Sequence, residues 1–343
     1  MDSITQFALG AAIGEHIAGK KAGNRAIFWG GIAGTIPDLD VLLNPFFTEL
    51  EKLSVHRGFS HSLMFAFLVA PVMAWLIHRL YQRKTEMNYK DWLWLFFWGI
   101  FTHPLLDAFT LYGTQLFLPF SDFRVAFNTI SIIDPMYTLP LLICSIGAMV
   151  LRRKNYTKAW NWNKAGLIFS STYLLLICAN KWYLEGIFDR NLAEQGIQPT
   201  QCMSNPVIFS NLLWCSVVKD DSACYIGYYS ILQKSNKVPY ERFPIHHELA
   251  STVKDQAGFK KLEWFSKDYY VLENRNDTLC FYDVRYGKST FDKPIDYEKS
   301  FVFYFKIADP EADQLSIEHY LSRKDMNMSR FFDQLGHRIL HDE

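Results

Sequence analysis

The sequence predicts a membrane-embedded α-helical bundle of about six hydrophobic helices, followed by a soluble α+β domain. Long apolar runs dominate the chain up to about residue 183, and beyond it the composition is polar and charged, as in an ordinary globular domain. Short runs of β-forming residues recur in this second part. The expected division is a membrane-embedded helical domain at residues 1–185 and a soluble domain at residues 186–343.

Length and charge narrow the class of protein. The 343 residues suffice for two domains, and the formal net charge of +0 leaves no electrostatic footprint for nucleic acid, which is not an expected partner. The expected partner is the lipid bilayer. No cleavable signal peptide is expected, because the small residues near the N-terminus belong to a segment that continues into further apolar chain.

Six apolar segments give the predicted number of helices. A full membrane span needs about 20 mostly apolar residues, and the last four segments meet that length. The first two are short and glycine-rich, so we expect tilted or half-inserted helices packed closely against the others. The six segments are residues 3–19, 26–43, 60–80, 92–109, 132–151 and 165–183.

Basic residues set the expected orientation. Lys and Arg gather in the connections between the first and second, third and fourth, and fifth and sixth segments, and they are sparse in the other connections. Short loops rich in Lys and Arg face the cytoplasm. The remaining connections and the C-terminal domain are therefore expected to face the external side of the membrane. The basic residues are Lys20, Lys21, Arg25, Arg79, Arg83, Lys84, Lys90, Arg152, Arg153, Lys154, Lys158 and Lys164.

Potential metal ligands occur at the segment ends that this orientation places outside. Two carboxylates follow a proline, two histidines five residues apart precede the third segment, and a histidine and an aspartate end the fourth. Carboxylate oxygens and imidazole nitrogens together suit Zn, Mn or Fe, and also a two-metal hydrolytic centre. The orientation argument used none of these residues, so their convergence favours a metal site. The six candidates are Asp38, Asp40, His56, His61, His103 and Asp107.

Each pair alone also has an ordinary structural interpretation. Asp38 and Asp40 could form a polar turn after a span, because Asp is a common turn residue. The two histidines could be interfacial side chains. His103 and Asp107 share a helix face at i and i+4 and could form an ion pair. Within a site, Asp107 is either a direct ligand or the acceptor of the other ring proton of His103.

The C-terminal domain is expected to mix strands and helices. β-type runs occur at residues 207–218, 225–232, 269–272, 279–286 and 301–307, and helical patterns at residues 248–258 and 326–340. Four of the six cysteines, Cys202, Cys215, Cys224 and Cys280, lie in this domain. An oxidising compartment would allow a disulfide among them, with the pairing left open.

Several motifs resemble those of the YdjM-like family of inner-membrane proteins, which are regarded as metal-dependent hydrolases. They are MDSITQ at the start, GTIPDLD, VHRGFSHS, THPLLDAFTLYGTQLFLPFSD and, for a subset of the family, the NLLW…YIGYYS region. The first four fall within about the first 130 residues. The family is distantly similar to zinc-dependent phospholipase C and single-strand nucleases, helical proteins that cleave phosphodiesters with clustered zinc ions.

The resemblance implies that all six candidates are ligands of a divalent metal, with zinc expected first. Asp38 and Asp107 are also expected to take part in catalysis. Arg57 beside the histidines, with Arg124 as a second candidate, is expected to hold an anionic substrate oxygen. Many family members have a histidine where this chain has Gln6. Whether Gln6 or Asp2 joins the site, and how many ions bind, stay open.

The expected function is a membrane-bound, metal-dependent hydrolase acting on a phosphodiester or other ester of an amphiphilic substrate at the outer membrane–water interface. The metal would polarise a phosphoryl or acyl oxygen and lower the pKa of a bound water. One alternative is a non-enzymatic metal-binding protein, either a transporter or a structural clip. Transport sites usually lie near the bilayer midplane, whereas these residues gather at one end. Another alternative is a scaffold in which the polar cluster only holds helices together.

Overall fold

The computed structural model describes residues 1–276, 278–288, 295–321 and 328–341. The chain forms two compact units: Met1–Asn44 with Val55–Ala179, and Pro45–Ser54 with Asn180–Glu343. The division at Ala179 and the predicted one at residue 185 both lie within a single helix, α7 (Tyr156–Glu194). Residues 45–54, which include most of α3 (Glu49–Val55), belong to the second unit.

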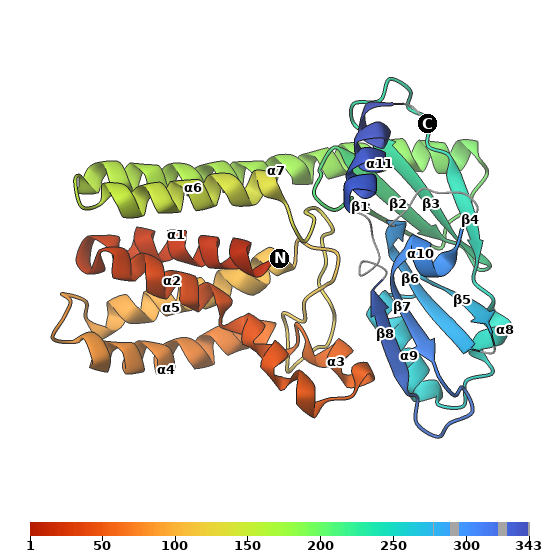
Figure 1. The fold of residues 1–343 in the computed structure, drawn as a ribbon, viewed down its shortest axis with the longest axis horizontal. Coiled ribbons are helices and arrows are strands. Elements are labelled where there is room, and N and C mark those ends of the chain that lie inside the picture. Colours follow the sequence, from red (N-terminus) through yellow and green to blue (C-terminus); the bar gives the residue numbers. More distant parts are fainter. Residues whose placement is uncertain (277, 289–294, 322–327, 342–343) are drawn as a thin grey trace. The chain divides into compact units, whose positions relative to one another are not determined.

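The first unit is helical (Figure 1). Helices α1 and α2 form an antiparallel pair, α4 and α5 form another, and α6 is followed by α7. Two 3-10 helices, η1 and η2, precede α3 and α4. The bounds are α1 Ser3–Ala22, α2 Asn24–Thr35, η1 Pro37–Phe46, η2 Phe59–His61, α4 Leu63–Tyr81, α5 Tyr89–Asp107 and α6 Pro135–Leu151.

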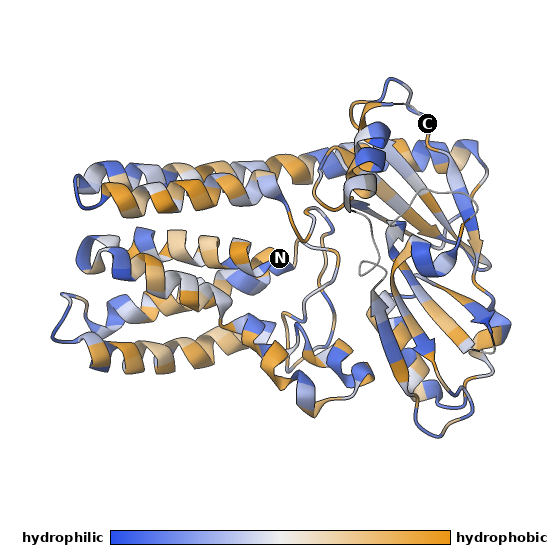
Figure 2. Cartoon of the chain, in the orientation of Figure 1, coloured by the Kyte–Doolittle hydropathy of each residue, from blue (hydrophilic) through white to orange (hydrophobic). Residues whose placement is uncertain are grey.

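Fewer membrane spans are present than the six predicted. Among the described residues, α4 and α7 are long and apolar enough to cross a membrane, and α2 with η1, bent by 44°, could form a third span. Helix α6 is apolar, but its 17 residues rise only about 26 Å. Helices α1 and α5 have sufficient length, but they carry polar side chains such as Glu15 and His103 that lower their hydropathy. Figure 2 shows the apolar residues concentrated along the helices of this unit.

Glycines bring α1 and α2 into backbone contact. A Cβ added at Gly10 would lie 2.3 Å from the carbonyl oxygen of Gly30, and one added at Gly34 would lie 2.4 Å from the carbonyl oxygen of Gln6. Gly14 faces Gly30 in the same way. Because only glycine allows this approach, the two short segments pack as one closely joined pair.

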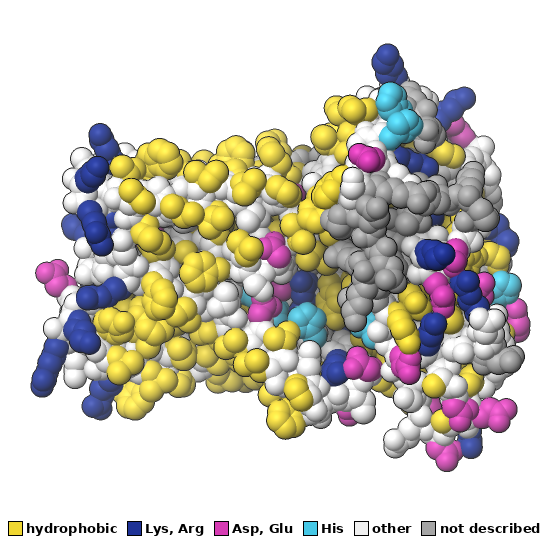
Figure 3. Space-filling model, viewed as in Figure 1, with side chains coloured by type: hydrophobic (Ala, Val, Ile, Leu, Met, Phe, Trp, Pro, Cys, Tyr) yellow, Lys and Arg dark blue, Asp and Glu magenta, His cyan; other side chains and the backbone are white. Residues whose placement is uncertain are grey.

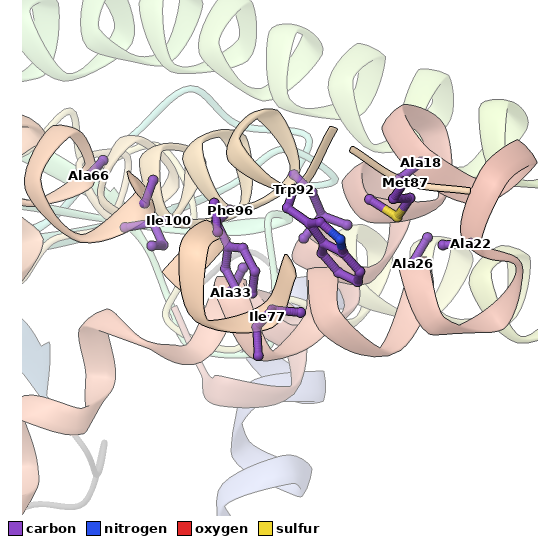
Figure 4. Close-up of a cluster of buried hydrophobic side chains, with 13 residues drawn as sticks. Ala18, Ala22, Ala26, Ala33, Ala66, Ile77, Met87, Trp92, Phe96 and Ile100 are labelled. Atoms are coloured by element: carbon purple, nitrogen blue, oxygen red, sulfur yellow. The ribbon is translucent and has the colours of Figure 1, made fainter. Parts of the chain in front are cut away.

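The core between α2, α4 and α5 combines large side chains on one helix with small ones on the others. Helix α5 contributes Trp92, Phe96 and Ile100, spaced four residues apart on one face (Figure 4). Helix α4 presents alanines at the same spacing, including Ala66, and α2 presents Ala33. This arrangement fixes the end of α5, where two of the candidate ligands lie.

Basic residues gather at one end of the helical unit. The loops joining α1 to α2, α4 to α5, and α6 to α7 all lie there (Figure 1). In Figure 3 the Lys and Arg side chains form a cap on this end, next to a broad band of hydrophobic side chains. Ion pairs tie the loops together: Lys21 Nζ lies 2.8 Å from Asp91 Oδ1, and Arg152 pairs with Glu15. The grouping of basic loops used to predict the orientation is therefore present in the fold.

The second unit contains two four-stranded antiparallel sheets within the described residues, β1-β2-β3-β4 and β5-β6-β7-β8. The last turns of α7 supply Leu184, Ile187 and Phe188 to a core with Trp214 and Tyr229 of the first sheet. The bounds are β1 Gln201–Pro206, β2 Leu213–Lys219, β3 Ala223–Ser230, β4 Tyr240–Pro244, α8 His247–Ala250, α9 Gln256–Ser266, β5 Tyr270–Arg275, β6 Thr278–Lys288, α10 Tyr297–Ser300, β7 Phe301–Ile307, β8 Ile317–Leu321 and α11 Met328–Leu340.

The cysteines do not form the disulfide that the sequence allowed. All six lie in the described part of the chain and all are free. Burial raises the pKa of the Cys215 and Cys224 thiols to about 12, so both stay protonated at neutral pH. Cys202 is the exposed one.

Candidate metal centre

Four of the predicted ligands converge at the end of the helical unit opposite the basic loops. Asp38 comes from η1, His61 from η2, and His103 and Asp107 from the last turns of α5. One ligand atom from each lies within 4.8 Å of all the others. His61, His103 and Asp107 are buried, and the side chain of Asp38 is 21% exposed. Three separate segments thus place four ligand atoms around one point.

The spacing of these atoms matches a tetrahedral metal. The Nε2 atoms of His61 and His103 are 3.1 Å apart, and Asp38 Oδ1 lies 3.4 Å from each of them. Asp107 Oδ2 lies 3.4 Å from His61 Nε2 and 3.5 Å from His103 Nε2. Four ligands bound to zinc at about 2.0–2.1 Å lie about 3.3 Å from one another. Five of the six distances therefore fit a tetrahedral ion, and the sixth, between the two carboxylates, is at most 4.8 Å. We call Asp38, His61, His103 and Asp107 the cage.

Hydrogen bonds fix both imidazoles with Nε2 facing the cage. His103 Nδ1 lies 2.6 Å from the carbonyl oxygen of Gly34, which can only accept, so Nδ1 carries the proton. Ser60 Oγ donates to Asp40 Oδ2 at 3.1 Å and accepts from His61 Nδ1 at 3.0 Å. In their neutral forms the two rings therefore point Nε2 lone pairs at each other. A cation between them satisfies both, and the outer bonds are those that commonly orient metal-bound histidines.

The free carbonyl of Gly34 results from the end of α2. In a continuing α-helix it would accept from the N–H of residue 38. Helix α2 ends at Thr35, and Pro37, which has no N–H, begins the 3-10 helix η1. Carbonyls in a last helical turn need partners from outside the helix, and His103 of α5 provides one here.

Asp40 and His56, also predicted as ligands, lie beside the cage instead of in it. Asp40 Oδ1 lies 3.3 Å from His56 Nδ1, while Asp40 Oδ2 accepts from the N–H of Arg57 at 3.1 Å and lies 3.5 Å from His61 Nδ1. Asp40 thus braces the turn that carries His61. His56 is partly exposed and packs against the ring of Tyr112, with centroids 5.3 Å apart.

Arg57 contacts a cage carboxylate directly. Its Nε lies 3.2 Å from Asp107 Oδ2, and its Nη1 donates to Thr110 Oγ1 at 2.7 Å. Its guanidinium carbon lies 5.0 Å from the centroid of the Tyr112 ring, and that of Arg124 lies 4.6 Å from the same centroid. Both arginines are buried. The structure therefore places a compact cationic group against the inner side of the cage.

Two contacts at Asp107 were not foreseen from the sequence. The amino group of Met1 pairs with Asp107 Oδ1, and Gln6 Nε2 donates to the same oxygen at 3.0 Å. Gln6 therefore touches the site through its amide nitrogen, which cannot ligate a metal. Asp2 accepts from the N–H groups of Ile4 and Thr5, at 3.1 and 3.0 Å, and so caps α1. Gln6 thus contacts the site through Asp107, and Asp2 contributes the cap of the helix that carries Gln6.

The long connection between α5 and α6 is the other feature that the sequence analysis missed. It folds back on itself through paired hydrogen bonds between Thr114 and Val125. Gln115 N donates to the Arg57 carbonyl at 3.2 Å, and the Leu116 carbonyl accepts from Leu63 N at 3.0 Å. The connection is thus hydrogen-bonded to the backbone just before and just after the turn that carries His61. Its length alone was a usable signal, because loops of this length inside a compact unit are commonly functional.

Comparison with known proteins identifies the family. A family model described as YdjM inner membrane protein matches residues 1–184, more than half of the chain. The chain belongs to this family. All four cage residues lie in the matched region. The YdjM match and the apolar helices support an inner-membrane location.

Two relatives extend this finding. The chain is 36% identical over 123 residues to the inner membrane protein YbcI of Escherichia coli (strain K12), which covers 35% of this chain and 69% of YbcI. It is 24% identical over 268 residues to the protein named "Uncharacterized protein YfhP" of Bacillus subtilis (strain 168), covering 72% of this chain and 75% of YfhP. The similarity to YfhP thus reaches into the second unit. No solved structure matches the chain.

Proposed function

We propose that this protein is a membrane-embedded, metal-dependent hydrolase that acts on a phosphodiester or other ester of an amphiphilic substrate. One observation carries the proposal. Two imidazoles, held by Gly34 and Ser60 with their Nε2 atoms 3.1 Å apart, face each other between two carboxylates. Two facing lone pairs need a positive charge between them, either a proton shared by the rings or a metal ion, and four ligand atoms gathered around one point favour the metal.

The donor set indicates which metal. Two imidazole nitrogens with carboxylate oxygens suit zinc, with manganese or iron as the alternatives. Two histidines with one carboxylate is also a ligand set that hydrolytic zinc enzymes use while keeping a position open. A divalent ion held here supplies Lewis-acid polarisation of a phosphoryl or acyl oxygen. We assign His61, His103 and Asp38 as the permanent ligands.

We assign Asp107 a different role from Asp38. Its Oδ2 faces the cage but also lies 3.2 Å from Arg57 Nε, and its Oδ1 is engaged by Gln6 and the Met1 amino group. These donors already satisfy much of its charge, so it is the weakest ligand of the four. Asp107 can therefore leave the fourth position to substrate and serve as a general base within reach of it. Arg57 keeps Asp107 ionised and oriented.

The same geometry favours a second candidate, a structural metal clip. Four protein ligands close a tetrahedron, and closed tetrahedral sites are typically structural. Such a clip would join η1, η2 and α5 without chemistry. A transporter is less favoured, since the cage lies at helix ends and transport sites usually lie near the bilayer midplane.

Elemental analysis of detergent-purified protein tests the metal, and hydrolysis assays separate the two candidates. We expect about one equivalent of transition metal in the wild type and little in His61→Ala. Bis(p-nitrophenyl) phosphate and a long-chain p-nitrophenyl ester serve as probes, with activity that is removed by chelator and restored by zinc. Metal without activity on either probe would favour the clip. Wild-type protein free of transition metal, with a fold indifferent to chelator, would refute both.

We further propose that the cage and the second unit face the periplasm or exterior. The basic loops support this orientation, because they share the opposite end of the helical unit. Cys202 provides a native reporter, since it is exposed while Cys215, Cys224 and Cys280 are buried. A membrane-impermeant maleimide should label the wild type in intact cells and fail to label Cys202→Ser. Lys154→Cys in the Cys202→Ser background should react only after permeabilisation. The reverse pattern would overturn the orientation.

A further inference from the structure

The connection between α5 and α6 exposes large aromatic side chains next to the cage. Phe117 is 49% exposed, Phe120 87%, Phe123 62% and Phe127 50%. Exposed apolar side chains scattered singly are common, but four phenylalanines within eleven residues of one loop form a patch. Such a patch indicates a surface that another apolar phase covers.

The backbone of this loop is anchored, so the patch has a defined position. Thr114 and Val125 bond each other at 3.0 and 2.9 Å, and Phe127 N donates to the Ala108 carbonyl at 2.7 Å. Phe117 directly follows Leu116, whose carbonyl accepts from the N–H of Leu63, the first residue of the candidate span α4. Phe117 therefore lies level with the end of a helix that can cross the bilayer.

A second segment beside the cage is equally apolar. In η1, Leu39, between Asp38 and Asp40, is 54% exposed, and Leu42 and Leu43, shortly after Asp40, are 67% and 48% exposed. This segment forms the bent continuation of α2. Two chain segments beside the cage therefore expose mainly hydrocarbon side chains.

Charge distinguishes these segments from the other end of the helical unit. The loops there carry most of the basic residues of the unit. Between residues 108 and 134 the only Lys or Arg is Arg124, which is buried. The apolar segments also continue directly from helices that expose large apolar side chains. Segment η1 follows α2, where Phe28 is 52% exposed, and the loop follows α5, where Trp94 is 52% exposed. In an inner-membrane protein, lipid is the apolar phase that such helix surfaces meet.

We propose that the loop bearing Phe117, Phe120, Phe123 and Phe127 is an interfacial anchor that inserts into the lipid leaflet at the cage end of the bundle. Leu39, Leu42 and Leu43 of η1 enter the same leaflet. Apolar side chains of this kind bury about 5–10 Å into the boundary between head groups and acyl chains. The cage then lies at head-group level. This holds whether the metal is catalytic or structural.

Depth-dependent quenching tests the anchor. An environment-sensitive fluorophore (NBD) is attached to Phe120→Cys in a Cys202→Ser background, and the protein is placed in nanodiscs with phosphatidylcholine that carries a doxyl quencher high on the acyl chain. We expect blue-shifted emission and about a two-fold loss of fluorescence. The matched control is the same label at Lys254→Cys, whose side chain is 62% exposed in the second unit, with no quenching expected.

Two outcomes would overturn the proposal. Water-like emission without quenching at position 120 places the loop in solvent, and blue-shifted emission without quenching places it against protein. Phe123→Cys gives a second labelling position if Phe120→Cys does not fold. The quenching reports where residue 120 lies and does not depend on hydrolytic activity. The anchor proposal would therefore stand even if the hydrolase proposal failed.

Discussion

Both ends of the helical unit bury charged side chains, but they satisfy them differently. At the basic end Glu15 is buried and pairs with Arg152, which also bonds the Gly19 carbonyl, and Lys21 pairs with Asp91. Glu15 and Asp91 thus each face an opposite charge from the protein. At the other end His61 and His103 are both held with Nε2 toward the same point, together with two carboxylates.

Comparing the two ends distinguishes charged side chains that stabilise the fold from side chains arranged to bind an ion. A buried ion pair within the protein is neutral and complete, so it needs nothing further. The cage concentrates lone pairs and negative charge on one point, and its neighbouring cations, Arg57 and the Met1 amino group, both contact Asp107. On the proposed function, a metal ion in the middle completes that arrangement. The following substitutions test this difference, from the largest expected effect to the smallest.

Removing a cage histidine should have the largest effect. His61→Ala and His103→Ala are each expected to lower metal affinity by more than about 100-fold, because loss of a ligand exceeds the 10–100-fold cost of losing an outer partner. Metal content by elemental analysis measures this. His16→Ala is the matched control, since His16 stacks on Trp160, 5.9 Å between centroids, in the basic half of the unit. Equal metal loss in the control would remove the distinction between the ends.

Glu15→Gln should cost stability without affecting metal. Leaving Arg152 without its buried carboxylate is expected to destabilise the protein by about 3 kcal/mol. The midpoint of thermal unfolding in detergent should fall while metal content stays at the wild-type value. A fall in both would mean that the two ends are coupled.

Asp40→Asn should weaken the metal site without abolishing it. The change removes the charge that orients Ser60 and the His61 ring, and such outer contacts are worth about 10–100-fold in affinity. Competition with a zinc chelator of known affinity measures the loss. The control is Asp122→Asn, an exposed carboxylate on the α5–α6 connection. If Asp40→Asn abolished binding as fully as His61→Ala, Asp40 would have to be counted as a ligand.

Lys21→Gln should have the smallest effect. Its partner Asp91 and Lys21 itself are 21% and 45% exposed, and exposed ion pairs contribute less than about 1 kcal/mol. Thermal unfolding should barely change and metal content should not change at all. A large loss of stability would show that the loops at the basic end depend on this pair.

The sequence predicts that the site residues gather at one end of the helical unit, but it does not predict which of them face one another. Lys/Arg counting was enough to bring Asp38, His61, His103 and Asp107 to one end of the helical unit. It could not tell Asp38 from Asp40. Both lie in the 3-10 helix η1, where three residues make a turn, so side chains two residues apart point about 120° away from each other. One therefore reaches the cage and the other reaches the far side of His61.

The elements of the second unit show the same limit. The predicted runs at residues 225–232, 279–286 and 301–307 overlap β3, β6 and β7, whereas β1, with the sequence QCMSNP, lacks β-branched and large aromatic residues and was missed. The helix predicted at residues 248–258 is replaced by α8 and α9. Asp255 caps the start of α9 by accepting from Gly258 N at 2.9 Å. This side-chain cap fixes where α9 begins, which the spacing of apolar residues alone did not reveal.

The Gly34 carbonyl makes part of this site independent of side-chain identity. The atom that fixes the protonation of His103 belongs to the main chain, and every amino acid would supply it. Substitution at position 34 therefore acts only by displacing α2 from α1, through the clash with the Gln6 carbonyl. A search for equivalent centres in other proteins by their side chains alone would find the four ligands and overlook this partner. The break in the helix, marked by Pro37, is the feature that such a search should include.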